Sequence, residues 1–239
     1  MRKAFAVLRM ALAGLGAVGL VGDFFYTLGF RAFQIDNFFA YFTTQSNMAG
    51  VIVLGLSGLL SVAREREPRW LSAARALVLT YMVVSGIVFA LIAAESNARG
   101  IRVDVPWSSA LLHFIIPSLA LLDWILAPGR HPVSWRAALT VLGFPIVWGV
   151  ITLVRGALIG WYPYFFLDPA QVDGPVMFVL YDVIVLTLIS GMAVFVLALG
   201  RVRPLRAAPS PDWNGPLASL RELVSRGRRR TAPAPPARG

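Results

Sequence analysis

A block of hydrogen-bonding side chains begins the second apolar stretch of the sequence. Residues 41–47 read YFTTQSN, and the polar members are Thr43, Thr44, Gln45, Ser46 and Asn47. A hydroxyl group becomes a nucleophile when an adjacent base takes its proton, and imidazole suits that task near neutral pH. One of the two histidines, His113, also lies in an apolar stretch. A threonine and a histidine brought together would therefore form a nucleophile–base pair.

The elements that must position these residues are six apolar blocks. Of the 239 residues 57% are hydrophobic and 14% are charged, against about 25% charged in soluble domains. The blocks span residues 4–30, 37–62, 71–94, 107–127, 135–156 and 174–200. Each supplies the ~20 residues that a helix needs to cross a bilayer. The sequence predicts an all-α polytopic membrane protein, with six transmembrane helices in a bundle over residues 1–200.

The first block also has features of a signal peptide, because basic residues precede an apolar run and small residues. The run continues to Phe30, past any plausible cleavage site, which favours a retained first helix. Basic residues gather at the start, in the second and fourth loops and in the tail. The positive-inside rule then places both termini in the cytoplasm.

Residues 201–239 are rich in Pro, Ala, Arg and Ser and are predicted to be a disordered cytoplasmic tail. Next to a membrane, its basic residues fit anionic lipid headgroups better than nucleic acid. Membrane lipids are thus the expected partners. The sequence indicates no oligomeric state.

Polar residues from all six blocks are expected at one depth. With a rise of ~1.5 Å per residue, Thr43 and His113 lie about 9 Å from the outer ends of their helices. The same layer contains Asp23, Thr44, Ser46, Asn47, Glu95, Arg155 and Asp182. Ionisable groups within a bilayer usually face a wet cavity. The layer predicts a polar cavity, open to the outer side or reached sideways from the outer leaflet. The inner half has fewer such groups, among them Asp123 and Arg9.

Pro117 follows His113 by four residues. Proline lacks an N–H and clashes with the carbonyl four residues back, so the helix should be irregular at His113 with that carbonyl free. Thr43 and Asn47 share a helix face. Structural readings remain open, because histidine and small polar residues also hydrogen-bond between membrane helices.

A nucleophile–base pair needs supporting groups. Asp182, Asp23 or Glu95 would be the third member that orients the imidazole. Arg155, Asn47 or Gln45 would donate hydrogen bonds to an oxyanion. The stretch WYPYFFLDP (161–169), with Tyr162 and Tyr164, fits either an interfacial aromatic belt or a segment that covers the cavity.

Other chemistries find little support in the residues. The sequence has no cysteine, which removes thiolate nucleophiles, iron–sulfur clusters and Cys-ligated zinc. It has no histidine pair at metal-binding spacing and no nucleotide-binding motif. We therefore expect no metal and no cofactor.

The order of YFTTQSN, HFIIPSLALLD and WYPYFFLDP resembles the Pr6Pr family of six-span bacterial membrane proteins, over about residues 4–200. It also remotely resembles the eukaryotic androgen-induced family, whose members are integral-membrane threonine hydrolases of fatty acyl esters. This resemblance implies a nucleophile at Thr43, with Thr44 as the neighbouring alternative, and a base at His113. It also implies a location in the bacterial plasma membrane.

Two functions follow from these patterns. The first is a membrane lipid-ester hydrolase that uses Thr43 and His113. The second is a non-enzymatic carrier or receptor for a small amphiphilic ligand, in which the same polar groups line a binding cavity. A third hypothesis is a structural membrane protein, whose polar groups serve helix packing alone. The distance between Thr43 and His113 separates the first from the others.

Overall fold

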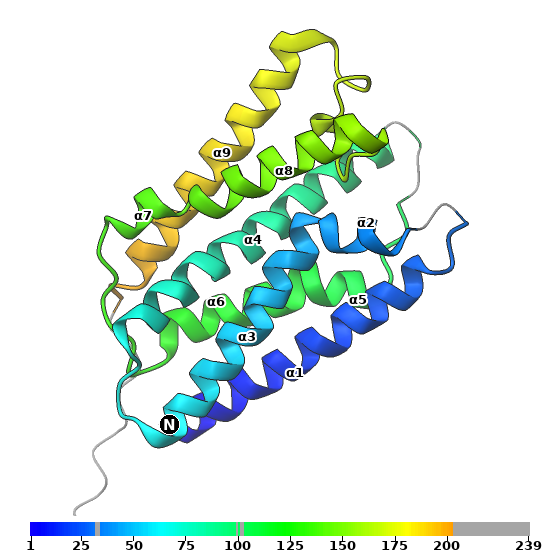
Figure 1. The fold of residues 1–239 in the computed structure, drawn as a ribbon. Coiled ribbons are helices and arrows are strands. Elements are labelled where there is room, and N and C mark those ends of the chain that lie inside the picture. Colours follow the sequence, from blue (N-terminus) through cyan, green and yellow to red (C-terminus); the bar gives the residue numbers. More distant parts are fainter. Residues whose placement is uncertain (32–33, 99, 101–102, 203–239) are drawn as a thin grey trace, which may run out of the picture. The chain divides into compact units, whose positions relative to one another are not determined.

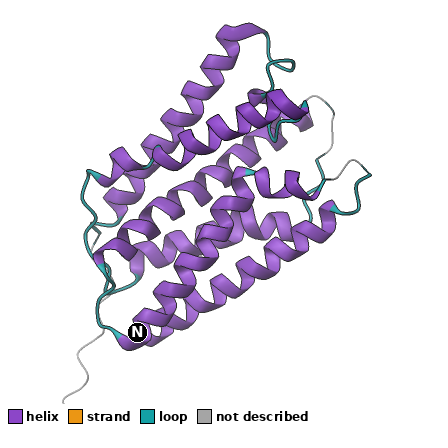
Figure 2. Cartoon of the chain, viewed as in Figure 1, coloured by secondary structure: helices purple, strands orange, loops and turns teal. Residues whose placement is uncertain are grey.

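The computed structural model describes residues 1–31, 34–98, 100 and 103–202. In these residues all regular secondary structure is helical, as Figure 2 shows. Six segments are long and apolar enough to cross a membrane. The prediction of an all-α, multi-pass integral membrane protein is confirmed for this part of the chain. The predicted tail lies outside the described residues from position 203 onward, and the cytoplasmic placement of the termini stays a prediction.

Consecutive spanning segments run in opposite directions (Figure 1). The first three are α1 (Arg2–Thr27), α3 (Phe42–Ala63) with the short α2 (Ile35–Ala40) before it, and α4 (Arg69–Ala98). The fourth contains α5 (Trp107–Ala110), the π-helical turn η1 (Leu111–Ile115) and α6 (Ile116–Leu126). The last two are α7 (Ala137–Thr140) with α8 (Gly143–Ile159), and α9 (Gly174–Leu199), after a 3₁₀ turn η2 (Phe165–Leu167).

Two of the predicted blocks are interrupted in the structure. Block 37–62 breaks at Tyr41, which has extended backbone (φ −66°, ψ 134°), so a new helix begins at Phe42. Block 135–156 breaks between α7 and α8. The first break carries no Pro or Gly, so the sequence pattern did not indicate it. At the second break Gly143 begins α8, and Pro145 has no N–H for the carbonyl of Val141. The first break has a consequence for the site, because it places Thr43 in the first turn of α3.

Close helix packing positions the first four spanning segments. α3 lies against both α1 and α4, and α4 also contacts η1, α6 and α9. A Cβ on Gly58 would lie 3.0 Å from the carbonyl oxygen of Ala6, so this glycine lets α1 and α3 approach closely. The indole of Trp124, 1% exposed, donates to the carbonyl of Val196 at 2.8 Å and links α6 to α9.

A buried ion network ties the opposite ends of the same helices. The Arg9 guanidinium donates to Glu67 at 2.7 Å and to Asp123 at 2.9 Å. Arg75 donates to Glu67 at 2.6 Å and also bonds to Asp123. All four residues are buried, and they join α1, the loop before α4, α4 and α6. The sequence indicated Asp123 and Arg9 as inner polar groups but missed Glu67 and Arg75.

Candidate functional site

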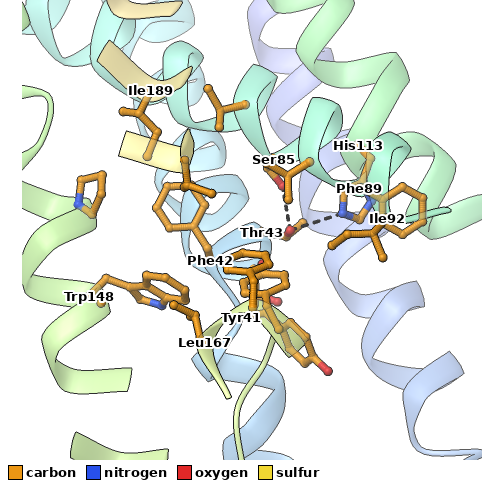
Figure 3. Close-up of a pocket in the computed structure, with 18 of the residues that line it drawn as sticks. Tyr41, Phe42, Thr43, Ser85, Phe89, Ile92, His113, Trp148, Leu167 and Ile189 are labelled. Atoms are coloured by element: carbon orange, nitrogen blue, oxygen red, sulfur yellow. Dashed lines mark hydrogen bonds between the residues drawn. The ribbon is translucent and has the colours of Figure 1, made fainter. Parts of the chain in front are cut away.

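One pocket receives residues from all six spanning segments. Its volume of about 410 Å³ lies within the roughly 300–1,000 Å³ of small-molecule sites. The polar residues of its lining include Asp23, Thr43, Ser85, Ser109, His113, Tyr164 and Asp182. Figure 3 shows Thr43 directed toward His113, with Trp148 on the other side of the pocket. The six spans that were expected to share a polar cavity do border one pocket, but most of its lining is apolar.

Thr43 and His113 are in contact. The Thr43 Oγ1 lies 3.3 Å from the His113 Nε2. On the other side of the ring, Nδ1 lies 2.9 Å from the carbonyl oxygen of Ser109. A carbonyl oxygen only accepts, so the neutral ring carries its proton on Nδ1 and leaves Nε2 as an acceptor. The imidazole is therefore oriented to receive the proton of the Thr43 hydroxyl.

Residues of α4 hold both members of this pair. The Ser85 Oγ lies 2.7 Å from the Thr43 Oγ1. When Thr43 donates to His113, Ser85 donates to Thr43, so the two bonds are compatible. One turn further along α4, the Phe89 ring stacks on the imidazole with ring centroids 4.0 Å apart. Rotation or translation of α4 would thus disturb Thr43 and His113 together.

The backbone around His113 departs from an α-helix as Pro117 predicts. Residues Leu111–Ile115 form a π-helical turn, in which the N–H of Ile116 donates to Leu111 O. Pro117 has no N–H for the carbonyl of His113. Gly86 of α4 packs against that carbonyl, since a Cβ at position 86 would lie 2.1 Å from its oxygen. Only glycine permits this approach, which brings α4 and η1 together at the site.

Two tyrosines border Thr43 from outside the spanning helices. Burial raises the pKa of Tyr164 to about 12, and hydrogen bonds with Thr43 and with the backbone of Phe42 offset part of the shift. Burial, together with the nearby Asp23, also raises the pKa of Tyr41. Tyr164 thus stays protonated at neutral pH, with a hydroxyl group beside Thr43. Phe166 and Leu167 line the pocket as well, so part of the stretch 161–169 borders the cavity.

Among the described residues, the hydrogen bonds of the His113 ring go to Ser109 and Thr43 rather than to a carboxylate. Asp23 and Asp182 line the pocket, but Asp23 accepts a hydrogen bond from Ser108 at 3.1 Å. Ser109 binds the Nδ1 of His113 through its carbonyl oxygen and, at 3.2 Å, its hydroxyl. The backbone of α5 therefore orients the ring in place of a third acidic residue. The π-helical turn brings this carbonyl within reach, which residue spacing did not reveal.

The remaining members of YFTTQSN contribute unequally. Thr44 lines the pocket, whereas the Gln45 side chain donates to Phe39 O at 2.9 Å. Ser46 and Asn47 both donate to the carbonyl of Thr43, at 3.1 Å and 3.0 Å. Their side chains thus fix the backbone that carries Thr43. They are not among the residues that line the pocket.

Three further predicted site residues lie outside the pocket lining. Arg155 donates to Asp36 at 2.8 Å and to Asn37 at 2.6 Å. The Tyr162 ring covers Gly156, where a Cβ would lie 2.1 Å from it. Glu95 is near the end of α4 and does not line the pocket. Their predicted depth is compatible with the site, but depth alone does not fix the direction of a side chain.

Three residues of the site were missed in the sequence. Ser85, Phe89 and Ser109 occupy apolar stretches where serine and phenylalanine are typical packing residues. Ser85 and Phe89 are spaced four apart, which places them on one helix face. This spacing is compatible with contacts to one site, but it does not show which residues the two side chains contact.

No group of three or more His, Cys, Asp or Glu side chains gathers as metal ligands in the described part of the chain. Comparison of the sequence and the structure with models of protein families, with curated proteins and with solved structures finds no match. The case for a function therefore rests on the geometry of the pocket.

Proposed function

We propose that this protein is an integral-membrane hydrolase that cleaves acyl esters of lipids, with Thr43 as nucleophile and His113 as base. The observation that carries the proposal is the pair of contacts that the two ring nitrogens of the imidazole make. Its Nδ1 proton is held by a backbone carbonyl, and its Nε2 accepts from a threonine hydroxyl at 3.3 Å. The Thr43–His113 pair also borders a cavity of about 410 Å³. A threonine–histidine bond that served helix packing alone would have no need of such a cavity.

The reaction would proceed through an acyl-enzyme. Thr43 Oγ1 attacks the ester carbonyl carbon while its proton moves to His113 Nε2. His113 then returns that proton to the leaving alkoxide, and an alcohol departs. Water attacks the acyl-threonine while His113 takes its proton. The intermediate then collapses, His113 returns that proton to Thr43 Oγ1, and the acid departs. The hydroxyl groups of Ser85 and Tyr164 lie beside Thr43 and supply donors for the oxyanion.

The surroundings support a lipid substrate. The pocket lies within helices that are apolar enough to span a membrane, and most of its lining is aliphatic or aromatic. We infer that both termini face the cytoplasm and that the site opens toward the outer leaflet of a bacterial plasma membrane. The resemblance to the Pr6Pr family and, remotely, to the androgen-induced threonine hydrolases supports the same assignment.

Labelling with a fluorophosphonate, which traps activated hydroxyl nucleophiles, tests the proposal. The purified protein in liposomes should form one adduct, and mass spectrometry should place it on Thr43. Thr43→Ala and His113→Ala should abolish labelling, because one lacks the nucleophile and the other lacks the base. The matched control is Thr44→Ala, which removes the adjacent hydroxyl and should label normally.

The same experiment can refute the assignment. A folded wild-type protein that forms no adduct, or an adduct that survives Thr43→Ala, would exclude the proposed nucleophile. The pocket would then be a binding site for a small amphiphilic ligand, as in a carrier or a receptor.

A further inference from the structure

α8 forms the wall of the pocket that the rest of the protein covers least. The segment Ala137–Ile159 is the least buried of the six spanning segments. Ile146 and Val150 line the pocket, yet they are 49% and 57% exposed. These residues are one helical turn apart and define an edge along which the pocket meets its surroundings. For a spanning helix those surroundings are lipid chains.

The side of the pocket beyond the Thr43–His113 pair is aliphatic. α8 contributes Ile146, Val150 and Leu153, and α9 contributes Val185, Leu186 and Ile189. Figure 3 shows Ile189 and Trp148 on the side of the pocket away from His113. An aliphatic chain placed here would bury its surface against branched side chains, with one end near the hydroxyl of Thr43.

Gly149 leaves room in this wall. It lines the pocket, and no atom lies within 4 Å of the position that its Cβ would occupy. Gly143, on the same helix, has equally open space around it but does not line the pocket. The two glycines allow a bulky side chain to be placed either inside or outside the pocket, without a clash at the Cβ in either case.

The charge of the lining restricts the ligand. Among the described residues of the lining, Asp23 and Asp182 carry carboxyl groups, and there is no Lys or Arg. A phosphate or carboxylate on the ligand would lie in an apolar site with no Lys or Arg to pair with, which is costly. A head group with hydroxyls can instead donate hydrogen bonds to these carboxyl groups.

We propose that the pocket takes one aliphatic chain of an uncharged acyl ester sideways from the bilayer, through an opening along α8, and that Gly149 provides the space for this chain. The ester rests on the proposed function, whereas binding of the chain does not require the chemistry of Thr43. Monoacylglycerols have the required chemistry: one chain, one ester and a head group of free hydroxyls.

The test uses the full-length protein in phosphatidylcholine liposomes with a monoacylglycerol that carries a diazirine in the middle of its chain. After irradiation, mass spectrometry should find adducts on α8 and α9, and unlabelled monoacylglycerol should compete. Gly149→Phe should lower the adduct yield roughly tenfold or more, because its ring occupies the space of the chain. Gly149→Leu fills less space and should give an intermediate yield, while Gly143→Phe should leave the yield unchanged.

A fatty acid with the same diazirine chain tests the charge argument, and its carboxylate should lower the yield roughly tenfold. Equal yields in Gly149→Phe and wild type, adducts outside α8 and α9, or preference for the fatty acid would overturn the proposal. Thr43→Ala should keep the adducts. Diazirine adducts without fluorophosphonate labelling would refute the hydrolase but support the opening along α8. Fluorophosphonate labelling with the same adduct yield in wild type and Gly149→Phe would support the hydrolase but refute the opening.

Discussion

Gly86→Ala should disable the site without replacing any of its polar side chains. The added Cβ would lie 2.1 Å from the carbonyl oxygen of His113, whereas real Cβ contacts stay above 3.0 Å. Helix α4 and η1 must therefore separate by about 0.9 Å. The new Cβ is attached directly to the backbone of α4, and the carbonyl oxygen is part of the backbone of η1. Rotation of a side chain therefore cannot relieve the clash.

A shift of this size acts on the reacting pair directly. Ser85 precedes residue 86 and bonds to Thr43, while the His113 Nε2 is already 3.3 Å from the Thr43 Oγ1. A further 0.9 Å would place the ring beyond hydrogen-bond distance of the hydroxyl. A displacement of about 1 Å costs roughly 100-fold in rate when it misaligns reacting groups. Overpacking should lower stability by only about 1–3 kcal/mol.

The assay compares the rate of fluorophosphonate labelling with the melting temperature in the same detergent. Gly86→Ala should label roughly 100-fold more slowly at a temperature where it is fully folded. Gly191→Ala in α9 is the control, because no atom lies within 4 Å of its new Cβ. Labelling of the Gly86→Ala variant within a factor of about three of wild type would show that the approach of α4 to η1 does not set the geometry of the pair.

Two further predictions concern the ion network. Asp123→Asn leaves Glu67 alone to balance the buried charges of Arg9 and Arg75 and should cost roughly 3–5 kcal/mol, seen as a lower melting temperature. Asp36→Asn breaks an exposed pair and should cost less than about 1 kcal/mol, and equal losses in the two variants would contradict the argument. Burial favours a higher pKa for Glu67, but Arg75 and Arg9 outweigh it and hold the pKa below the ordinary 4.5. Its stabilising effect is thus present above pH 4.5 and lost as the pH falls below it, so Glu67→Gln should flatten the decline of the melting temperature in acid.

The sequence predicted the spans and the central pair for a physical reason. Spans are set by length and apolar content, and the rise of a helix converts residue number into depth. His113 and Thr43 were expected at one depth, and they meet. Pro117 predicted the freed carbonyl, because the missing N–H is a local property of the chain.

The contacts that were missed depend on how each helix is rotated about its axis and how closely two helices approach. The depth of a residue in the membrane determines neither. Arg155 has the right depth but turns to Asp36. Ser109 replaces the expected carboxylate because the π-helical turn directs the His113 ring back to the carbonyl of residue 109. Glu67 lies in a charged loop, EREP, and such a sequence is typical of a solvent-exposed surface. In the structure Glu67 is only 4% exposed and forms ion pairs with two arginines.

α4 connects the two polar regions of the bundle. It carries Arg75 in the ion network and, about three turns further on, Ser85 and Phe89 at the site. Between them Met82 fills the space at Gly50, where a Cβ would lie 2.6 Å from the Met82 sulfur. The network fixes α4 lengthwise against α1 and α6, and the apolar layer fixes its distance from α3.

The described part of the ion network takes no residue from α8 or α9. The helices that would set the distance between Thr43 and His113 are thus different from the helix along which a ligand would enter. α4 holds Thr43 through Ser85 and His113 through Phe89, and Gly86 lets α4 approach η1 closely. α8 borders the pocket as its least buried wall. Under the proposed function, a lipid chain that enters along α8 would not need to change the distance between Thr43 and His113. Changes along α8 should therefore alter which ligand is bound, and changes at Gly86 should alter how fast a bound one reacts.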